Sequence, residues 1–142
     1  ISLLGSQSVI ASIDYKYDDE TISVFDWVDN KVVKGSDGFN NYIKLCHDLE
    51  FGEILMNSVN KDGTGFGYDL EFLSNIALEC NLPLIAMGGA GKSDHFLPAL
   101  QLDGIDAVAT ANLLNFMGDA IPKARKRLID NKLELPSFQV MF

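Results

Sequence analysis

The sequence has 142 residues, of which 47% are apolar and 22% are charged. This length and composition favour one folded domain, spanning residues 1–142, and exclude a disordered chain. The 20 acidic residues outnumber the 11 basic ones, and the formal charge of -9 argues against nucleic-acid or anionic-membrane binding. No apolar run reaches the roughly 20 residues that a membrane-spanning helix needs.

Cysteine and histidine are sparse. Cys46 and Cys80 lie in apolar, helix-like segments, and neither has a Cys or His at metal-ligand spacing. We therefore expect reduced thiols in a cytoplasmic protein, with no disulfide, no metal and no cofactor. For His47 and His95 we expect ordinary surface or packing roles, because neither has a nucleophile nearby in the sequence.

Four short apolar runs, rich in β-branched residues, predict strands of a parallel sheet buried on both faces. They cover residues 8–14, 52–59, 82–89 and 105–111. Apolar residues at helical spacing predict a helix after each strand. These helices cover residues 39–50, 70–80, 95–102 and 121–133.

An insert lies between Asp14 and Phe39, after the first predicted strand. Its alternating pattern predicts a small β-hairpin with a turn at Asp29-Asn30, and we expect Phe25 and Trp27 to form the apolar side of this hairpin. The repeated strand–helix order predicts an α/β fold, either an open sheet or half of a (β/α)8 barrel. Four strands cannot close a barrel alone, so we expect pairing with a second copy or with a missing half.

Polar and glycine-rich residues follow each strand, where parallel α/β proteins bind ligands. Asp14 ends the first strand, as either an acid/base catalyst or a solvated turn residue. Glu53 lies at the opposite end of the second strand, where a solvated or ion-paired acid is common. The loops at residues 60–69 and 88–92 are either tight turns or an anion site built from backbone amides.

Four segments, taken together, resemble the HisF family, the cyclase subunits of imidazole glycerol phosphate synthase. They read "GSQSVIASIDYK", "GEILMNSVNKDGTGFGYDLEFL", "IAMGGAGKSDHF" and "GIDAVATANLLNF". The resemblance runs from about residue 5 to about residue 133 and matches the family's C-terminal half. It implies a (β/α)8 TIM barrel of which this chain holds strands five to eight, with the N-terminal half-barrel absent.

The resemblance also implies a function. Family members combine ammonia from a glutaminase subunit, HisH, with a small bis-phosphate substrate in histidine biosynthesis, by ring-closure and lyase chemistry. Carried across, Asp14 is the catalytic acid/base and Glu53 lies at the ammonia entrance. The expected phosphate and substrate contacts are Asn57, Asp62, Gly63, Thr64, Gly88, Gly89, Ala111 and Asn112.

The sequence departs from the family pattern at several of these positions. Met87 stands where the family usually has Ser, Asn57 where it has Thr, Asn60 where it commonly has Asp, and Asn112 where it has Ser. Methionine cannot donate a hydrogen bond to phosphate, although asparagine can. These departures are similar to a branch of HisF-like paralogues that supply ammonia for acetamidino-sugar synthesis in surface polysaccharides. A third alternative is a non-catalytic, self-associating half-barrel.

Overall fold

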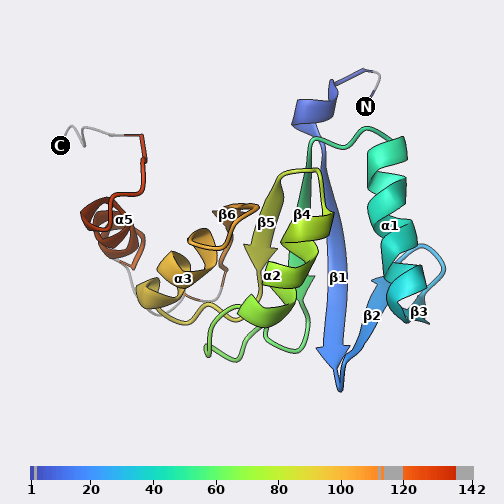
Figure 1. The fold of residues 1–142 in the computed structure, drawn as a ribbon, viewed down its shortest axis with the longest axis horizontal. Helices are drawn as coiled ribbons and strands as arrows, with labels where there is room; N and C mark the ends of the chain where they lie inside the picture. Colours follow the sequence, from blue (N-terminus) through green and yellow to red (C-terminus); the bar gives the residue numbers. More distant parts are fainter. Residues whose placement is uncertain (2, 112, 114–119, 137–142) are drawn as a thin grey trace.

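The computed structural model describes residues 1, 3–111, 113 and 120–136. These residues form a twisted sheet with helices packed along one face (Figure 1). In this described part of the chain, none of the helices is long and apolar enough to cross a membrane.

The elements alternate along the chain much as the sequence predicts. The strands are β1 (Ile10–Asp18), β2 (Thr21–Asp26), β3 (Lys31–Lys34), β4 (Glu53–Ser58), β5 (Leu84–Met87) and β6 (Ile105–Val108). The helices are α1 (Ser36–Asp48), α2 (Leu70–Glu79), α3 (Phe96–Leu100) and α5 (Ala120–Asp130), with short 3-10 turns η1 (Ser6–Ser8) and η2 (Ser93–His95). The α/β prediction is therefore confirmed.

The six-stranded sheet has the order β3-β2-β1-β4-β5-β6. Strands β1, β4, β5 and β6 are parallel, as expected for four βα units, and β2 and β3 are antiparallel. The predicted hairpin is confirmed, with Asn30 in a left-handed conformation in the turn between β2 and β3. The insert does more than predicted, however, because it joins the sheet.

A second hairpin connects β1 to β2. Strand β1 continues past Asp14 to Asp18, and Asp19 and Glu20 turn the chain with φ angles of 47° and 60°. Two consecutive positive φ angles match the turns whose twist suits a two-residue hairpin. The sequence offers no glycine or asparagine there, which is why this turn was missed.

One face of the sheet carries the core. Alternate residues of the strands are buried beneath the helices, as Ile13, Tyr15, Ile54 and Met56 illustrate. The Tyr15 ring stacks on Phe72 of α2 with a centroid distance of 4.4 Å. Helices α1 and α2 lie on the same side of the sheet (Figure 1).

Of the two cysteines, Cys46 is buried and Cys80 half-buried; both thiols are free, and burial raises the pKa of each.

The opposite face of the sheet is open within the described chain, so the expectation of strands buried on both faces is wrong for these residues. Ile10 is 50% exposed, and Leu55 and Ile85 are only half-buried. The sheet is also unfinished at its edges. Strand β2 pairs with β1 only from Tyr15 to Asp18, so residues 10–14 of β1 have no strand partner on that side among the described residues. Strand β6 is the opposite edge, and the barrel is not closed.

Candidate functional site

Side chains from three neighbouring strands form a row at the carboxyl end of the sheet. In the parallel register, Asp14 lies beside Asn57, and Asn57 lies beside Met87. The Asn57 Nδ2 atom donates a hydrogen bond to Asp14 Oδ1 at 2.8 Å. The register of β1, β4 and β5 therefore brings together residues that are far apart in the sequence.

Asp14 accepts a second hydrogen bond from the insert. The Trp27 Nε1 atom donates to Asp14 Oδ2 at 2.7 Å. Trp27 and Phe25 do contact each other, edge to face at 4.2 Å, but the prediction that Trp27 simply belongs to an apolar side is incomplete. Its indole is 71% exposed and turns its N–H toward the carboxylate. Sequence reasoning missed this contact; the only signal was one tryptophan in a hairpin that follows a strand-end acid.

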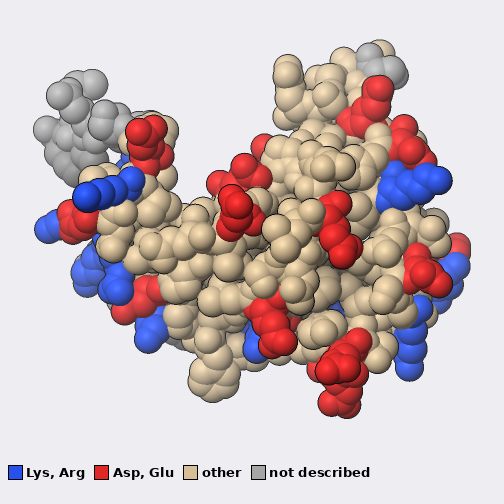
Figure 2. All heavy atoms as spheres, viewed as in Figure 1, with Lys and Arg blue, Asp and Glu red and all other residues tan. Residues whose placement is uncertain are grey.

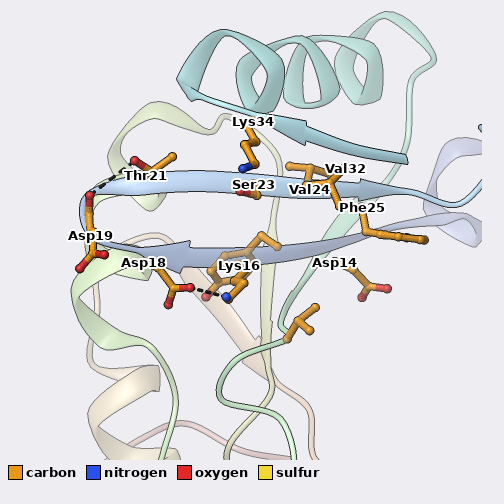
Figure 3. Close-up of a pocket in the computed structure, with 12 residues that line it drawn as sticks. Asp14, Lys16, Asp18, Asp19, Thr21, Ser23, Val24, Phe25, Val32 and Lys34 are labelled. Atoms are coloured by element: carbon orange, nitrogen blue, oxygen red, sulfur yellow. Dashed lines mark hydrogen bonds and ion pairs between the residues drawn. The ribbon is translucent and has the colours of Figure 1, made fainter. Parts of the chain in front are cut away.

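A groove of about 470 Å³ runs from Asp14 along the open face of β1, β2 and β3 (Figure 3). Val32 and Phe25 contribute to its apolar part. Its polar part includes two lysines, two acids and two hydroxyl residues: Lys16, Lys34, Asp18, Asp19, Thr21 and Ser23. Lys16 forms an ion pair with Asp18. The groove places Asp14 at the rim of an open concave surface.

A second hollow, of only about 10 Å³, lies where the two glycine-rich loops meet. Its lining is Asp62, Gly63, Gly65, Met87, Gly88, Gly89, Ala90, Ala109, Thr110 and Ala111. The loops are joined by a hydrogen bond from the Gly67 amide to the Gly89 carbonyl, at 2.8 Å. Small residues from three βα loops thus enclose a space that backbone groups can approach closely.

Two glycines are required by this close approach. Gly88 and Gly89 have φ angles of 95° and 98°, which side chains rarely adopt. A Cβ on Gly88 would lie 2.6 Å from the Ser58 carbonyl oxygen, and one on Gly89 would lie 2.1 Å from that of Gly67. The backbone of this loop is therefore packed directly against the neighbouring loops.

The predicted phosphate and substrate residues fall into groups. Asp62, Gly63, Gly88, Gly89 and Ala111 line the small hollow together. Thr64 does not: its hydroxyl donates to the Lys61 carbonyl at 2.7 Å and accepts from the Phe66 amide at 3.3 Å. Asn112 lies outside the described residues.

The remaining predicted residues, Asn57 and Glu53, lie in the same strand. Asn57 sits between the hollow and Asp14, with its Oδ1 3.3 Å from where a Gly88 Cβ would be. Glu53 begins β4 at the other end of the sheet, opposite Ile10. Asn60, the other departure in this loop, donates to the Tyr17 carbonyl at 3.0 Å and so ties the loop to β1.

His95 supports the loop at residues 88–92. The Gly91 amide donates to His95 Nδ1 at 3.2 Å, so the imidazole accepts on that nitrogen. Burial and the nearby Lys92 lower the pKa of His95, which favours the neutral ring that this bond needs. The imidazole also packs against Gly67 of the other loop, within 3.6 Å of where a Cβ would be. This is the packing role expected of His95, at the base of the candidate site.

Tyr68 and Asp69 lie where the same loop enters α2. The Tyr68 hydroxyl donates to the Ala109 carbonyl at 3.0 Å, and burial raises the pKa of this phenol. Burial also raises the pKa of Asp69.

Charges elsewhere are dispersed: on the face shown in Figure 2, acidic side chains are spread between basic groups at the two ends of the molecule. That face carries no continuous basic stripe.

Four parallel strands with a carboxylate and a glycine-lined hollow at their carboxyl ends have the layout of a barrel-type ligand-binding protein. Comparison with known proteins narrows this class. A model of the family described as "Histidine biosynthesis protein" matches residues 1–119. The chain belongs to this family, as a member of its HisF group.

Three relatives illustrate the similarity. A protein of Parasynechococcus marenigrum, named provisionally as imidazole glycerol phosphate synthase subunit hisF2, is 40% identical over 89% of this chain and 46% of its own length. The HisF subunits of Pyrobaculum aerophilum and a Hydrogenobaculum species are 36% and 33% identical, each over 92% of this chain and 51% and 52% of their own. The chain spans about half the length of the curated relatives it matches.

Proposed function

We propose that this chain is the C-terminal half of an ammonia-using cyclase of the imidazole glycerol phosphate synthase type. The observation that carries the proposal is the arrangement at the carboxyl end of the sheet. There, in a HisF-family chain, Asp14 and the glycine-lined hollow lie two strands apart. Strands in a sheet are about 4.8 Å apart, so Asp14 and the Met87 end of the hollow are separated by about 10 Å. A substrate whose phosphate lies against the glycine loops that line the hollow would place its sugar and ring within reach of Asp14.

In this proposal Asp14 transfers protons during ring closure and elimination, as acid and base in turn. Gly63, Gly88, Gly89 and Ala111 hold one substrate phosphate through close-approaching backbone groups. The chemistry requires no metal and no cofactor.

The proposed partner is a glutaminase subunit of the HisH type, which supplies ammonia at the amino-terminal end of the sheet. Glu53 begins β4 there, four residues before Asn57, which corresponds to about 13 Å along a strand. Ammonia entering near Glu53 would travel along the open, inner face of the sheet towards Asp14. Replacing Glu53 with Gln should lower glutamine-dependent turnover while turnover with added ammonium salt is kept.

The open face, and the edges of β1 and β6 that lack a strand partner among the described residues, support a second half-barrel. It comes either from another segment of the polypeptide or from a second copy of this chain. Light scattering on the chain alone should show a dimer or larger species, because exposed parallel edges and half-buried Leu55 and Ile85 need cover. A soluble monomer with a cooperative melt would contradict this proposal.

The paralogue function is the second candidate, and Met87 is the observation that favours it. Met87 lines the hollow with a side chain that cannot donate a hydrogen bond. In this alternative the protein delivers ammonia for acetamidino-sugar synthesis in surface polysaccharide. Assaying a complete barrel with the histidine-pathway substrate, beside an ammonia-transfer assay with an amidotransferase and a sugar acceptor, separates the two.

The central test uses a complete barrel that contains this half, wild type and Asp14→Asn. Ammonia-dependent turnover should be lost in the variant, because the amide cannot accept and return a proton. A Ser23→Ala variant, in the groove but without a hydrogen bond to Asp14, is the matched control. Turnover retained by Asp14→Asn would remove Asp14 from the mechanism. Turnover lost equally in Asp14→Asn and Ser23→Ala would show that the loss is not specific to Asp14 and would contradict its proposed role. A complete barrel that binds no phosphorylated substrate would contradict the proposed activity as a whole.

A further inference from the structure

Both oxygens of the Asp14 carboxylate are held by protein donors from different elements. Asn57 Nδ2 of β4 bonds Oδ1, and Trp27 Nε1 of the hairpin turn bonds Oδ2. An indole N–H and an amide NH2 can only donate, so both partners treat Asp14 as an acceptor. An ionised carboxylate has about four acceptor positions, and two therefore remain for a substrate.

The position of Trp27 is unusual for so large an apolar side chain. It is 71% exposed, and its described partners are the Phe25 ring and the Asp14 carboxylate. An indole left this open gains little from burial, so its placement depends on those two contacts. The hydrogen bond to Asp14 is the one that aims its N–H.

The turn that carries Trp27 is itself fixed. The Val28 and Asp29 amides donate to Asp26 Oδ1, at 3.0 and 3.1 Å. The Tyr42 hydroxyl of α1 donates to Asp26 Oδ2 at 2.8 Å. These donors, with Lys31 nearby, lower the pKa of Asp26 and keep it an anion. The hairpin is thereby tied to α1 and presents Trp27 over Asp14 from a rigid base.

Asn57 gives independent support from the other side. Its Oδ1 atom is buried and accepts no hydrogen bond from any described residue. An unpaired buried acceptor is costly, so the amide is oriented by its bond to Asp14 and not by a network of its own. Exchanging the amide's oxygen and nitrogen would set two acceptors against each other at 2.8 Å.

We propose that Trp27 and Asn57 are positioning residues that clamp the Asp14 carboxylate between the hairpin and β4. This proposal rests on the acid/base role proposed for Asp14 and deepens it. The clamp fixes the direction of the remaining lone pairs, so that Asp14 meets the substrate in one orientation. It also reassigns Asn57 from contacting the phosphate to orienting the acid/base group.

The first test needs no activity, because Trp27 is the only tryptophan in the chain. Its indole N–H gives a single resonance in a nitrogen–proton NMR spectrum. Asp14→Ala should move that resonance and speed its exchange with solvent about tenfold, the effect of one hydrogen bond to a charged acceptor. Ser23→Ala, which changes the same groove without a hydrogen bond to Trp27 or Asp14, should change the exchange rate less than twofold. An indole unaffected by Asp14→Ala would overturn the clamp.

The second test measures turnover of the complete barrel. Trp27→Phe keeps the aromatic contact with Phe25 but lacks the N–H; we expect kcat to fall about tenfold with KM within twofold. At position 57, the Asn57→Thr variant keeps a hydrogen-bond donor. The Asn57→Val variant has nearly the same shape as the Thr variant but no donor, so the kcat of Asn57→Thr should be at least tenfold higher than that of Asn57→Val. If Asp14→Ala retains turnover, the proposed function fails. If Asp14→Ala is inactive while Trp27→Phe, Asn57→Thr and Asn57→Val all match wild type, the positioning role fails alone.

Discussion

Gly89→Ala tests the close approach of the two glycine-rich loops. Gly89 has a φ angle of 98°, and an added Cβ would lie 2.1 Å from the Gly67 carbonyl oxygen and 3.0 Å from Lys61 Cβ. The first contact involves backbone and cannot be relieved by a side-chain rotation. The loops must therefore separate, which also weakens the 2.8 Å hydrogen bond from the Gly67 amide to the Gly89 carbonyl.

The cost can be estimated from its parts. Backbone strain at a positive φ costs about 1–2 kcal/mol, and a lost hydrogen bond about 1 kcal/mol. Relief of the overlap adds about 1 kcal/mol or more, as for other overpacked sites. We expect Gly89→Ala to lower the free energy of unfolding by about 3–4 kcal/mol, measured by urea denaturation followed by circular dichroism.

Gly63→Ala is the matched control. Gly63 has a φ of 75° and lines the same hollow, but an added Cβ would meet nothing within 4 Å. It should therefore cost only the strain, about 1–2 kcal/mol. Equal losses in the two variants would show that the loops are not packed against each other, and would refute the close-approach argument.

Three further predictions concern the surroundings of the hollow. Burial and Lys92 lower the pKa of His95, so the unfolded chain binds the proton more readily than the folded one. The stabilising contribution of His95 is therefore full above a pH of about 6.5 and is lost as the pH falls through the folded-state pKa. His95→Gln should remove this part of the pH dependence of the urea midpoint. Tyr68→Phe leaves the Ala109 carbonyl without its 3.0 Å donor and should cost about 1–2 kcal/mol in the same assay. Met87→Ser adds a donor at the hollow and should tighten inorganic phosphate binding about tenfold by calorimetry, whereas Met87→Ala should not; an unchanged affinity in the Ser variant would place the anion elsewhere.

The sequence predicts the strands well because their pattern is local. Each parallel strand is a short apolar run that ends in polar or glycine residues, and the register then sets Asp14 beside Asn57. For Gly88 and Gly89 the sequence pattern allows either a tight turn or an anion site, and only the structure shows their positive φ angles and their packing against neighbouring loops. The strand pattern follows from a few consecutive residues, whereas the register and the packing of the glycine loops depend on segments far apart in the chain.

The contact between Trp27 and Asp14 could not be predicted in the same way. It depends on β1 running on to Asp18, and on a turn at Asp19 and Glu20 that carries no glycine signal. An error of four residues in the end of one strand changes which side chain faces Asp14. The apolar pattern of the hairpin was correct, but whether the indole faces away from the site or toward it is decided by tertiary structure.

The site has little capacity to hold an anion with side chains, and this bears on which ligand it selects. In the row from Asp14 to Met87, the Asn57 donor is already committed to Asp14, and Met87 has no donor to offer. Asp62 adds a carboxylate to the lining of the hollow, which repels a phosphate at close range. Thr110 also lines the hollow, and its hydroxyl donates to the Ala90 carbonyl at 3.4 Å. Backbone amides of the glycine loops are therefore the main remaining donors for an anion there. Phosphate recognition would then depend on the backbone shape that Gly88 and Gly89 permit. Such a site accepts any substrate that carries a phosphate, so selection between these substrates depends on the ring or sugar that each presents to Asp14.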